Sequence, residues 1–258
     1  LKPSGGTIAP NYVKDQVKLY LEQYMSLPTR VITTDPDYMY ISIASEVQYN
    51  VTGTTKTATE IKALLNAAIK QFSQDHIETF ENDFRYSKFV THIDNTESSI
   101  TSNSTEIKII KRIYPLPNYP TTFELDFNNP TREEEVNSAL GYSKGAPFYD
   151  EPVVTSSAFT YTTSDGSVYD DCYIRDDNYG VLCVYKIIDN KFTILASSIG
   201  SVSYSTGVVK LRNITVSNYG SYLEIKVAPK NKDIVVSRDK ILIIDLNDVT
   251  LDIVPTKK

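Results

Sequence analysis

The chain has 258 residues, with 26 Lys and Arg against 32 Asp and Glu and a formal net charge of −6. This balance gives no basic field for a phosphate backbone, so we expect no nucleic-acid partner. No apolar run approaches the roughly 20 residues that span a bilayer, and no signal-peptide pattern opens the chain, so we expect a soluble protein with no membrane partner. Because the chain begins at Leu1 and its methionines are Met25 and Met39, we interpret it as a piece of a longer protein.

The first predicted element is a helix over about residues 12–25. Apolar side chains recur after Pro10 at spacings of three and four, and Pro28 ends the pattern. We treat this stripe as the candidate interface, on the hypothesis that its cover belongs to the missing part of the protein. The alternative is that the stripe packs against its own domain. The candidate interface residues are Val13, Val17, Tyr20, Leu21 and Tyr24.

A strand and a well-marked helix come next. Residues 38–47 are rich in β-forming side chains, and polar residues over 50–56 close the stretch. The helix over 57–72 opens with a capping box, in which Thr57 and Glu60 satisfy each other's backbone N–H groups. Apolar residues then recur at helical spacing, so one face of the helix must be buried. That stripe consists of Ile61, Leu64, Leu65, Ala68, Ile69 and Phe72.

Four further elements complete the first half of the chain. A shorter helix is predicted over 84–94, followed by alternating strands over 106–114 and 122–127. A small helix over 131–141 has a capping threonine at its start and a glycine at its end. This half therefore predicts a mixed helix and strand region of the α+β class.

A domain boundary is predicted at residues 141–152, which hold two Gly, two Pro and little periodicity. We expect residues 1–140 to form an α+β domain and residues 141–258 a mostly β domain. Beyond the boundary, turn signals separate short Val, Ile, Thr and Tyr runs, a pattern typical of an antiparallel meander or small sandwich. The runs at 241–244 and 249–254 are the most apolar, and we predict that they form central strands.

The residue types that carry catalysis do not form a recognisable set. His76 and His92 are the two histidines, and their spacing fits neither an i, i+4 metal pair nor a zinc finger. The aspartates between 165 and 177 do not match a calcium loop, and no nucleophile elbow or phosphate loop occurs. We therefore expect no catalytic residue, no cofactor, no metal site and no enzyme activity.

The two cysteines raise the question of a disulfide. Cys172 and Cys183 lie at equal distances from a turn centred between Asp177 and Asn178, so their sulfurs would face each other across a hairpin. A disulfide is one interpretation of this geometry. Because nothing marks the chain as secreted, we favour two reduced, packed thiols.

Four segments, taken in order, resemble a known family. TGTTKTATEIKALLNAAIKQF over 52–72 and FRYSKFVTHIDNTESSI over 84–100 are similar to the core of baseplate J-like proteins from contractile phage tails. YSTGVVKLRNITV over 204–216 and DIVVSRDKILIIDLNDVTLDIV over 233–254 resemble the closing β region of the same proteins. Within the family, the sequence looks like a C-terminal part of the wedge proteins of T4-like phages.

The resemblance implies a structural role in the virion, at the tail baseplate, after assembly in the host cytoplasm. Wedge proteins of this kind form homodimers that join into a ring around the tail hub, contact other wedge proteins and transmit the baseplate change during sheath contraction. We expect the same partners here. A host-binding or glycan-binding tail module is the main alternative, because the β-rich half could present loops to sugars. A hydrolase accessory to tail penetration is a third hypothesis.

Overall fold

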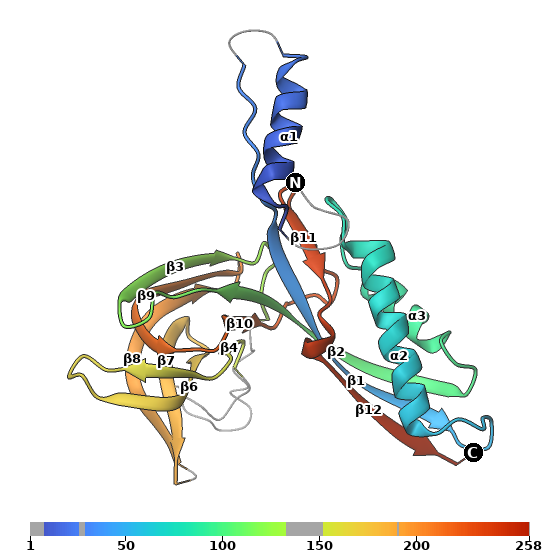
Figure 1. The fold of residues 1–258 in the computed structure, drawn as a ribbon. Coiled ribbons are helices and arrows are strands. Elements are labelled where there is room, and N and C mark those ends of the chain that lie inside the picture. Colours follow the sequence, from blue (N-terminus) through green and yellow to red (C-terminus); the bar gives the residue numbers. More distant parts are fainter. Residues whose placement is uncertain (1–7, 26–28, 133–151, 190, 258) are drawn as a thin grey trace.

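The computed structural model describes residues 8–25, 29–132, 152–189 and 191–257 (Figure 1). The expected mixture of helix and strand is present in these ranges, and strand dominates. The helical elements are α1 (Asn11–Glu22), α2 (Ala58–Phe72), η1 (Ser73–Ile77), α3 (Tyr86–Asp94) and η3 (Leu246–Asp248). The strands are β1 (Asp37–Asn50), β2 (Ile100–Ile113), β3 (Pro120–Asp126), β4 (Val154–Ser156), β5 (Phe159–Thr162), β6 (Val168–Asp176), β7 (Val181–Ile188), β8 (Lys191–Ser203), β9 (Val208–Asn218), β10 (Leu223–Val227), β11 (Lys240–Ile243) and β12 (Val249–Thr256).

The capped helix predicted over 57–72 is confirmed as α2. The Glu60 backbone N–H donates to Thr57 Oγ1 at 3.3 Å, and the Thr57 N–H donates to Glu60 Oε2 at 2.7 Å, so the capping box is complete. The buried stripe is narrower than the spacing predicts, because Leu64 lies at its margin and is 39% exposed. The buried residues of α2 are Ile61, Leu65, Ile69 and Phe72.

β1 is the central strand beneath the helices. It pairs antiparallel with β2 on one side, where Ile43 lies opposite Ile107. Alternate residues from Met39 to Val47 are buried, and Figure 1 shows α2 and α3 on the same face of these strands. The residues of β1 that alternate with these buried ones point to the opposite face of the sheet. The alternation predicted for a half-buried strand therefore fixes which face of β1 receives the helices.

The prediction that the last two strands are central is wrong. β11 and β12 both pair with β1 alone, in parallel, β11 along its first four residues and β12 from Ile43 onward. They are edge strands that are apolar because η1 and α2 pack against them. Ile241 and Leu242 are fully buried, and Leu251 is 5% exposed. Apolar content reports burial of a strand's face, whereas centrality depends on pairing at both edges.

The predicted antiparallel β region is present, but it closes into a small barrel rather than an open meander or a sandwich. β6, β5, β9, β8 and β7 each pair antiparallel with the next in that order, and β7 pairs back to β6. Register shifts in β5 and β7 mark irregularities that bend the strands and help the sheet to close. One tight contact is at Gly200, where an added Cβ would lie 2.0 Å from the Lys210 carbonyl oxygen. Glycine is required there because two backbones meet.

Strand pairing links the two halves of the chain. β3 pairs with β9 of the barrel, and β10 lies between β2 and β4. The predicted helix over 131–141 and the boundary at 140/141 fall mostly outside the described residues. Thr131, the predicted cap, forms an isolated bridge with Pro229. The division into domains 1–140 and 141–258 stays a prediction, and the pairings show that any such domains share one hydrogen-bonded sheet.

α1 belongs to an arm that projects away from both the sheet and the barrel (Figure 1). The arm consists of residues 8–25, which contain α1, and the returning segment 29–36, and we use that name below. Lys14 Nζ donates to Asp35 Oδ2 at 2.7 Å and ties the helix to the returning segment. The returning segment leads directly into β1 at Asp37. No residue of α1 is buried, so this helix does not pack into the described core.

Candidate functional site

The arm carries all five predicted interface residues. Tyr20 and Tyr24 are 60% and 73% exposed, and their ring centroids lie 5.2 Å apart, so they form one aromatic surface. Leu21 is exposed beside them, while Val13 and Val17 are half-buried. The structure thus places the predicted stripe on the projecting arm, and its aromatic end, Tyr20 and Tyr24, is the most accessible part.

The exposed apolar surface of the arm extends beyond that stripe. The spacing argument missed these residues because they lie off the helical stripe or outside the helix. The sequence signal that could have identified them is the presence of large apolar side chains off the stripe of α1 and in the segments next to it. The additional exposed apolar residues are Ile8, Tyr12, Leu19, Met25 and Ile32.

A charged cluster lies on the face of the sheet opposite α2 and α3, centred on Arg112 of β2. Its guanidinium donates to Glu224 at 3.0 Å, to Asp245 at 2.8 Å and to Asp248 at 3.0 Å. Lys226 binds Glu224 at 3.0 Å and Asp248 at 3.2 Å, so both carboxylates have a second cation. This cluster connects β2, β10 and the η3 turn that precedes β12.

Two tyrosine rings enclose the same guanidinium. Its central carbon lies 3.9 Å from the ring centroid of Tyr40 and 4.1 Å from that of Tyr222. Burial lowers the pKa of Arg112, but the hydrogen bonds that its guanidinium donates to Asp245 and Glu224 outweigh burial and raise the pKa overall. Arg112 therefore stays positively charged. It acts as a structural clasp, because its guanidinium holds three carboxylates together.

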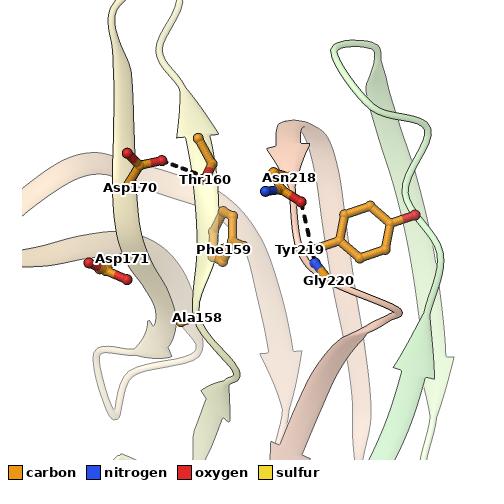
Figure 2. Close-up of a pocket in the computed structure, with 8 residues that line it drawn as sticks. All are labelled: Ala158, Phe159, Thr160, Asp170, Asp171, Asn218, Tyr219 and Gly220. Carbon is orange, nitrogen blue, oxygen red and sulfur yellow. Dashed lines mark hydrogen bonds between the residues drawn. The ribbon is translucent and has the colours of Figure 1, made fainter.

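A cavity of about 290 Å³ lies beside β5, β6 and the turn after β9 (Figure 2). Asp170 accepts a hydrogen bond from Thr160 Oγ1 at 2.7 Å, and Asp171 lines the same cavity. Phe159 is 3% exposed, and Figure 2 shows Tyr219 pointing away from the aspartates. A sugar pocket combines polar groups with an accessible aromatic face. Because Phe159 is nearly fully buried and Tyr219 points away from the aspartates (Figure 2), the cavity places no aromatic face beside its carboxylates.

The cysteines are buried free thiols, which confirms the favoured reduced state. The facing geometry, however, is wrong, because Cys183 lies opposite Arg175 in the ladder between β6 and β7. Asp177 Oδ1 accepts from the Tyr179 and Val181 N–H groups, both at 2.9 Å, and this longer turn moves the hairpin centre toward the C-terminus. Burial raises the pKa of Cys183 to about 11, so its reactive thiolate form is suppressed.

Both histidine rings pack near the ring of Phe72. Ring centroids are 4.9 Å apart for Phe72 and His76, and 5.4 Å apart for Phe72 and His92. His92 Nε2 lies 3.1 Å from the Ala68 carbonyl oxygen and therefore donates to it. Throughout the described ranges, no three His, Cys, Asp or Glu side chains form a group that could hold a metal ion. Each helix in those ranges is too short or too polar to cross a membrane.

Two comparisons with known proteins show what this chain is similar to. Residues 37–112, from the start of β1 to Arg112, match the family model for the baseplate structural protein gp6, C-terminal domain III. The baseplate wedge protein gp6 of Enterobacteria phage T4 is 20% identical over 282 aligned residues, which cover 98% of this chain and 43% of that protein. The chain is gp6-like. It spans less than half the length of this relative.

These matches confirm the resemblance to baseplate wedge proteins. Both describe a structural baseplate protein, which agrees with the structural role that the resemblance implies. The matched domain contains β1, α2, α3 and most of β2, including Arg112. The arm precedes the matched domain and enters it at Asp37.

Proposed function

We propose that the gp6-like chain is a structural wedge component of a contractile-tail baseplate that forms homodimers through its arm. In this proposal the dimers join into a ring around the tail hub, contact other wedge proteins and transmit the baseplate change during sheath contraction. The observation that carries it is the exposed apolar surface on an arm that no described core residue covers.

The size of that surface supports an interface. Tyr12, Tyr20 and Tyr24 are each 60% exposed or more, and five aliphatic side chains on the arm are 40% exposed or more. Together they offer on the order of 700 Å² of apolar area. A stable interface of standard size buries about 800 Å² on each partner. The apolar area that the arm exposes on all its sides is therefore comparable with one side of such an interface.

A second copy is the partner that the arm fits best. Two identical arms related by a two-fold axis would each place the Tyr20 and Tyr24 surface against the other, as in isologous dimers. Tyrosines suit such an interface because each offers a large contact area and a polar tip that can stay hydrated. The charged residues Lys18 and Glu22 form an i, i+4 pair on the same helix, with nitrogen and oxygen 3.9 Å apart, so they leave little net charge to repel a copy.

The route from the arm to the barrel supports a mechanical role. The arm continues into β1 at Asp37, and β1, β2, β10, β4 and β6 follow one another as hydrogen-bonded neighbours up to the barrel. A rotation of the arm would therefore be carried through a continuous sheet. Such rigid-body coupling is how interfaces transmit a change between distant parts of an assembly.

The proposal is tested by the mass of the chain in solution, measured by light scattering during size exclusion. We expect a mass about twice 29.0 kDa at micromolar concentration, and a monomer for the double variant Tyr20→Ser and Tyr24→Ser. The matched control is Tyr114→Ser with Tyr119→Ser, two equally exposed tyrosines outside the arm, which should leave the dimer intact. A wild-type monomer at every concentration would refute the homodimer.

A further inference from the structure

β12 is the outermost strand of the sheet on one side of β1 (Figure 1). Its eight residues pair with β1 in a continuous parallel register, and no shift interrupts that register. Among the described residues, no strand pairs with the other edge of β12, which we call the open edge. An edge of this kind presents backbone N–H and C=O groups to which a further extended segment can add as a strand.

One hydrogen bond shows which backbone groups lie at the open edge. The Val51 N–H donates to the Thr256 carbonyl oxygen at 3.2 Å, so Thr256 directs its backbone groups toward β1. Successive residues of a strand direct these groups to alternate edges, so those of Leu251 and Ile253 face away from β1. Pro255 belongs to the same outward series but has no N–H to donate. The open edge therefore presents the groups of Leu251 and Ile253 and ends at Pro255.

Two carboxylates lie next to each other beside the open edge, on the face of the sheet opposite α2 and α3. Asp252 is the register partner of Glu46 in β1, and both residues are exposed. Like charges at directly neighbouring positions destabilise a sheet. Gln48 donates a hydrogen bond to Glu46 at 3.2 Å, but no Lys or Arg of the described ranges forms an ion pair with either carboxylate. Glu106 on the neighbouring strand β2, by contrast, binds Lys232 at 3.1 Å.

These features define the strand that the open edge would accept. A Lys or Arg in that strand, placed beside Asp252, would neutralise the charge that Asp252 and Glu46 share. Its alternate side chains would lie beside Leu251 and Ile253, on the face where α2 packs, so apolar residues fit there. Charged residues and prolines on an edge discourage indiscriminate pairing. Asp252 and Pro255 therefore select a basic partner and limit the length over which it pairs.

We infer that the open edge binds an extended basic segment of a neighbouring protein, which adds to β12 as a strand and places a Lys or Arg against Asp252 and Glu46. A second copy does not suit this edge, because β12 paired with another β12 would bring the carboxylates of both copies together. The inference does not depend on the homodimer, since β12 shares no residue with the arm. It adds a backbone-pairing contact to the apolar surface that the arm offers.

The test is fluorescence anisotropy with a labelled peptide in which valine and lysine alternate. We expect the wild-type chain to bind this peptide with an affinity that falls as salt rises. A peptide of equal length in which valine and glutamate alternate should bind at least about tenfold more weakly, because it adds carboxylates to the existing pair. The valine–lysine peptide with two consecutive prolines at its centre should lose about as much affinity, because it keeps most of the charge but cannot continue as a strand.

Neutral variants test the two carboxylates. Glu46→Gln combined with Asp252→Asn keeps the size of both side chains and should weaken binding of the valine–lysine peptide by about tenfold. The matched control is Asp171→Asn combined with Asp189→Asn, which removes the same charge from exposed positions of the barrel and should alter the affinity by less than about twofold. Because Glu46 and Asp252 repel each other, their double variant should melt no lower than the wild type, which circular dichroism would verify.

Amide hydrogen exchange measured by NMR tests whether the backbone takes part. With the valine–lysine peptide bound, the Leu251 and Ile253 amides at the open edge should exchange at least about tenfold more slowly than in the free chain. The Asp252 and Val254 amides face β1 and should change little.

Several results would overturn the inference. These are equal affinity for the three peptides, an unchanged affinity in the Glu46→Gln and Asp252→Asn double variant, or no binding of the valine–lysine peptide at low salt. Binding that leaves the Leu251 and Ile253 amides unprotected would show a charge contact without strand addition. Protection of these amides that grows with the concentration of the free chain would assign the edge to a second copy instead.

Discussion

Removal of the Arg112 side chain should destabilise the fold strongly, because this guanidinium is largely buried and binds three carboxylates. Arg112→Ala would leave Glu224 and Asp248, whose side chains are 9% and 7% exposed, without their guanidinium. Breaking a buried ion pair in this way costs about 3–5 kcal/mol. Lys226 remains within 3.2 Å of both carboxylates, which moves the expected cost to the lower end of that range.

We therefore expect the free energy of unfolding to fall by about 3 kcal/mol in Arg112→Ala, part of it from lost stacking between Tyr40 and Tyr222. For a chain of this size, that loss corresponds to a melting temperature lower by roughly 6–12 °C. Arg112→Lys should recover only part of the loss, because lysine keeps the charge but not the planar fork that binds several carboxylates. Urea and thermal unfolding followed by circular dichroism, at one fixed protein concentration, would measure both variants.

The control is Arg238→Ala, since Arg238 also pairs with a glutamate, Glu81 at 3.3 Å, but is 93% exposed. Exposed pairs contribute about 0–1 kcal/mol, so this variant should unfold almost like the wild type. If Arg112→Ala were no less stable than Arg238→Ala, the interpretation of Arg112 as a structural clasp would be wrong.

Three further predictions follow from packing and charge. Leu65→Ala should lower the free energy of unfolding by about 2–5 kcal/mol in urea titrations, because Leu65 is fully buried, whereas Leu64→Ala at the exposed margin of α2 should cost about 1 kcal/mol or less. Cys172 and Cys183 should react with a thiol reagent only after unfolding, and fast labelling of the native protein would contradict their burial. Burial raises the pKa of Asp245 but the Arg112 hydrogen bond and charge lower it further, so its folded pKa lies below its unfolded value. Its stabilisation is present above about pH 4 and is lost as pH falls through the folded pKa, and an acid titration of Arg112→Ala should show a smaller loss.

The elements defined by local chemistry could be predicted from the sequence. The α2 helix was predictable because the Thr57 capping box and the apolar spacing are both encoded within a few residues. The edge position of β11 and β12 could not be predicted, because a buried strand has the same apolar sequence whether one or both of its edges are paired. Leu242 pairs with Met39 on the buried face of an edge strand against which η1 packs, and only the topology of the sheet determines that position.

The hairpin and the arm show two other limits. A turn centred between Asp177 and Asn178 was the simplest reading of the cysteine spacing, yet the Asp177 side chain stabilises a longer loop that ends at Gly180, where φ is +94°. That shift placed Arg175, instead of Cys172, opposite Cys183. For the arm, amphipathic spacing predicts an apolar stripe, but no sequence pattern says which molecule covers a stripe.

The claim that two copies of the chain pair through their arms is tested most directly by measuring whether the two arms lie close together. A nitroxide label at Asp15→Cys, an exposed polar position on α1, gives a dipolar signal between electron spins only when two chains come close. The buried Cys172 and Cys183 should remain unlabelled in the native protein. The account predicts a defined interspin distance that disappears in the Tyr20→Ser and Tyr24→Ser double variant. An absent signal in a sample whose measured mass is that of a dimer would contradict pairing through the arm.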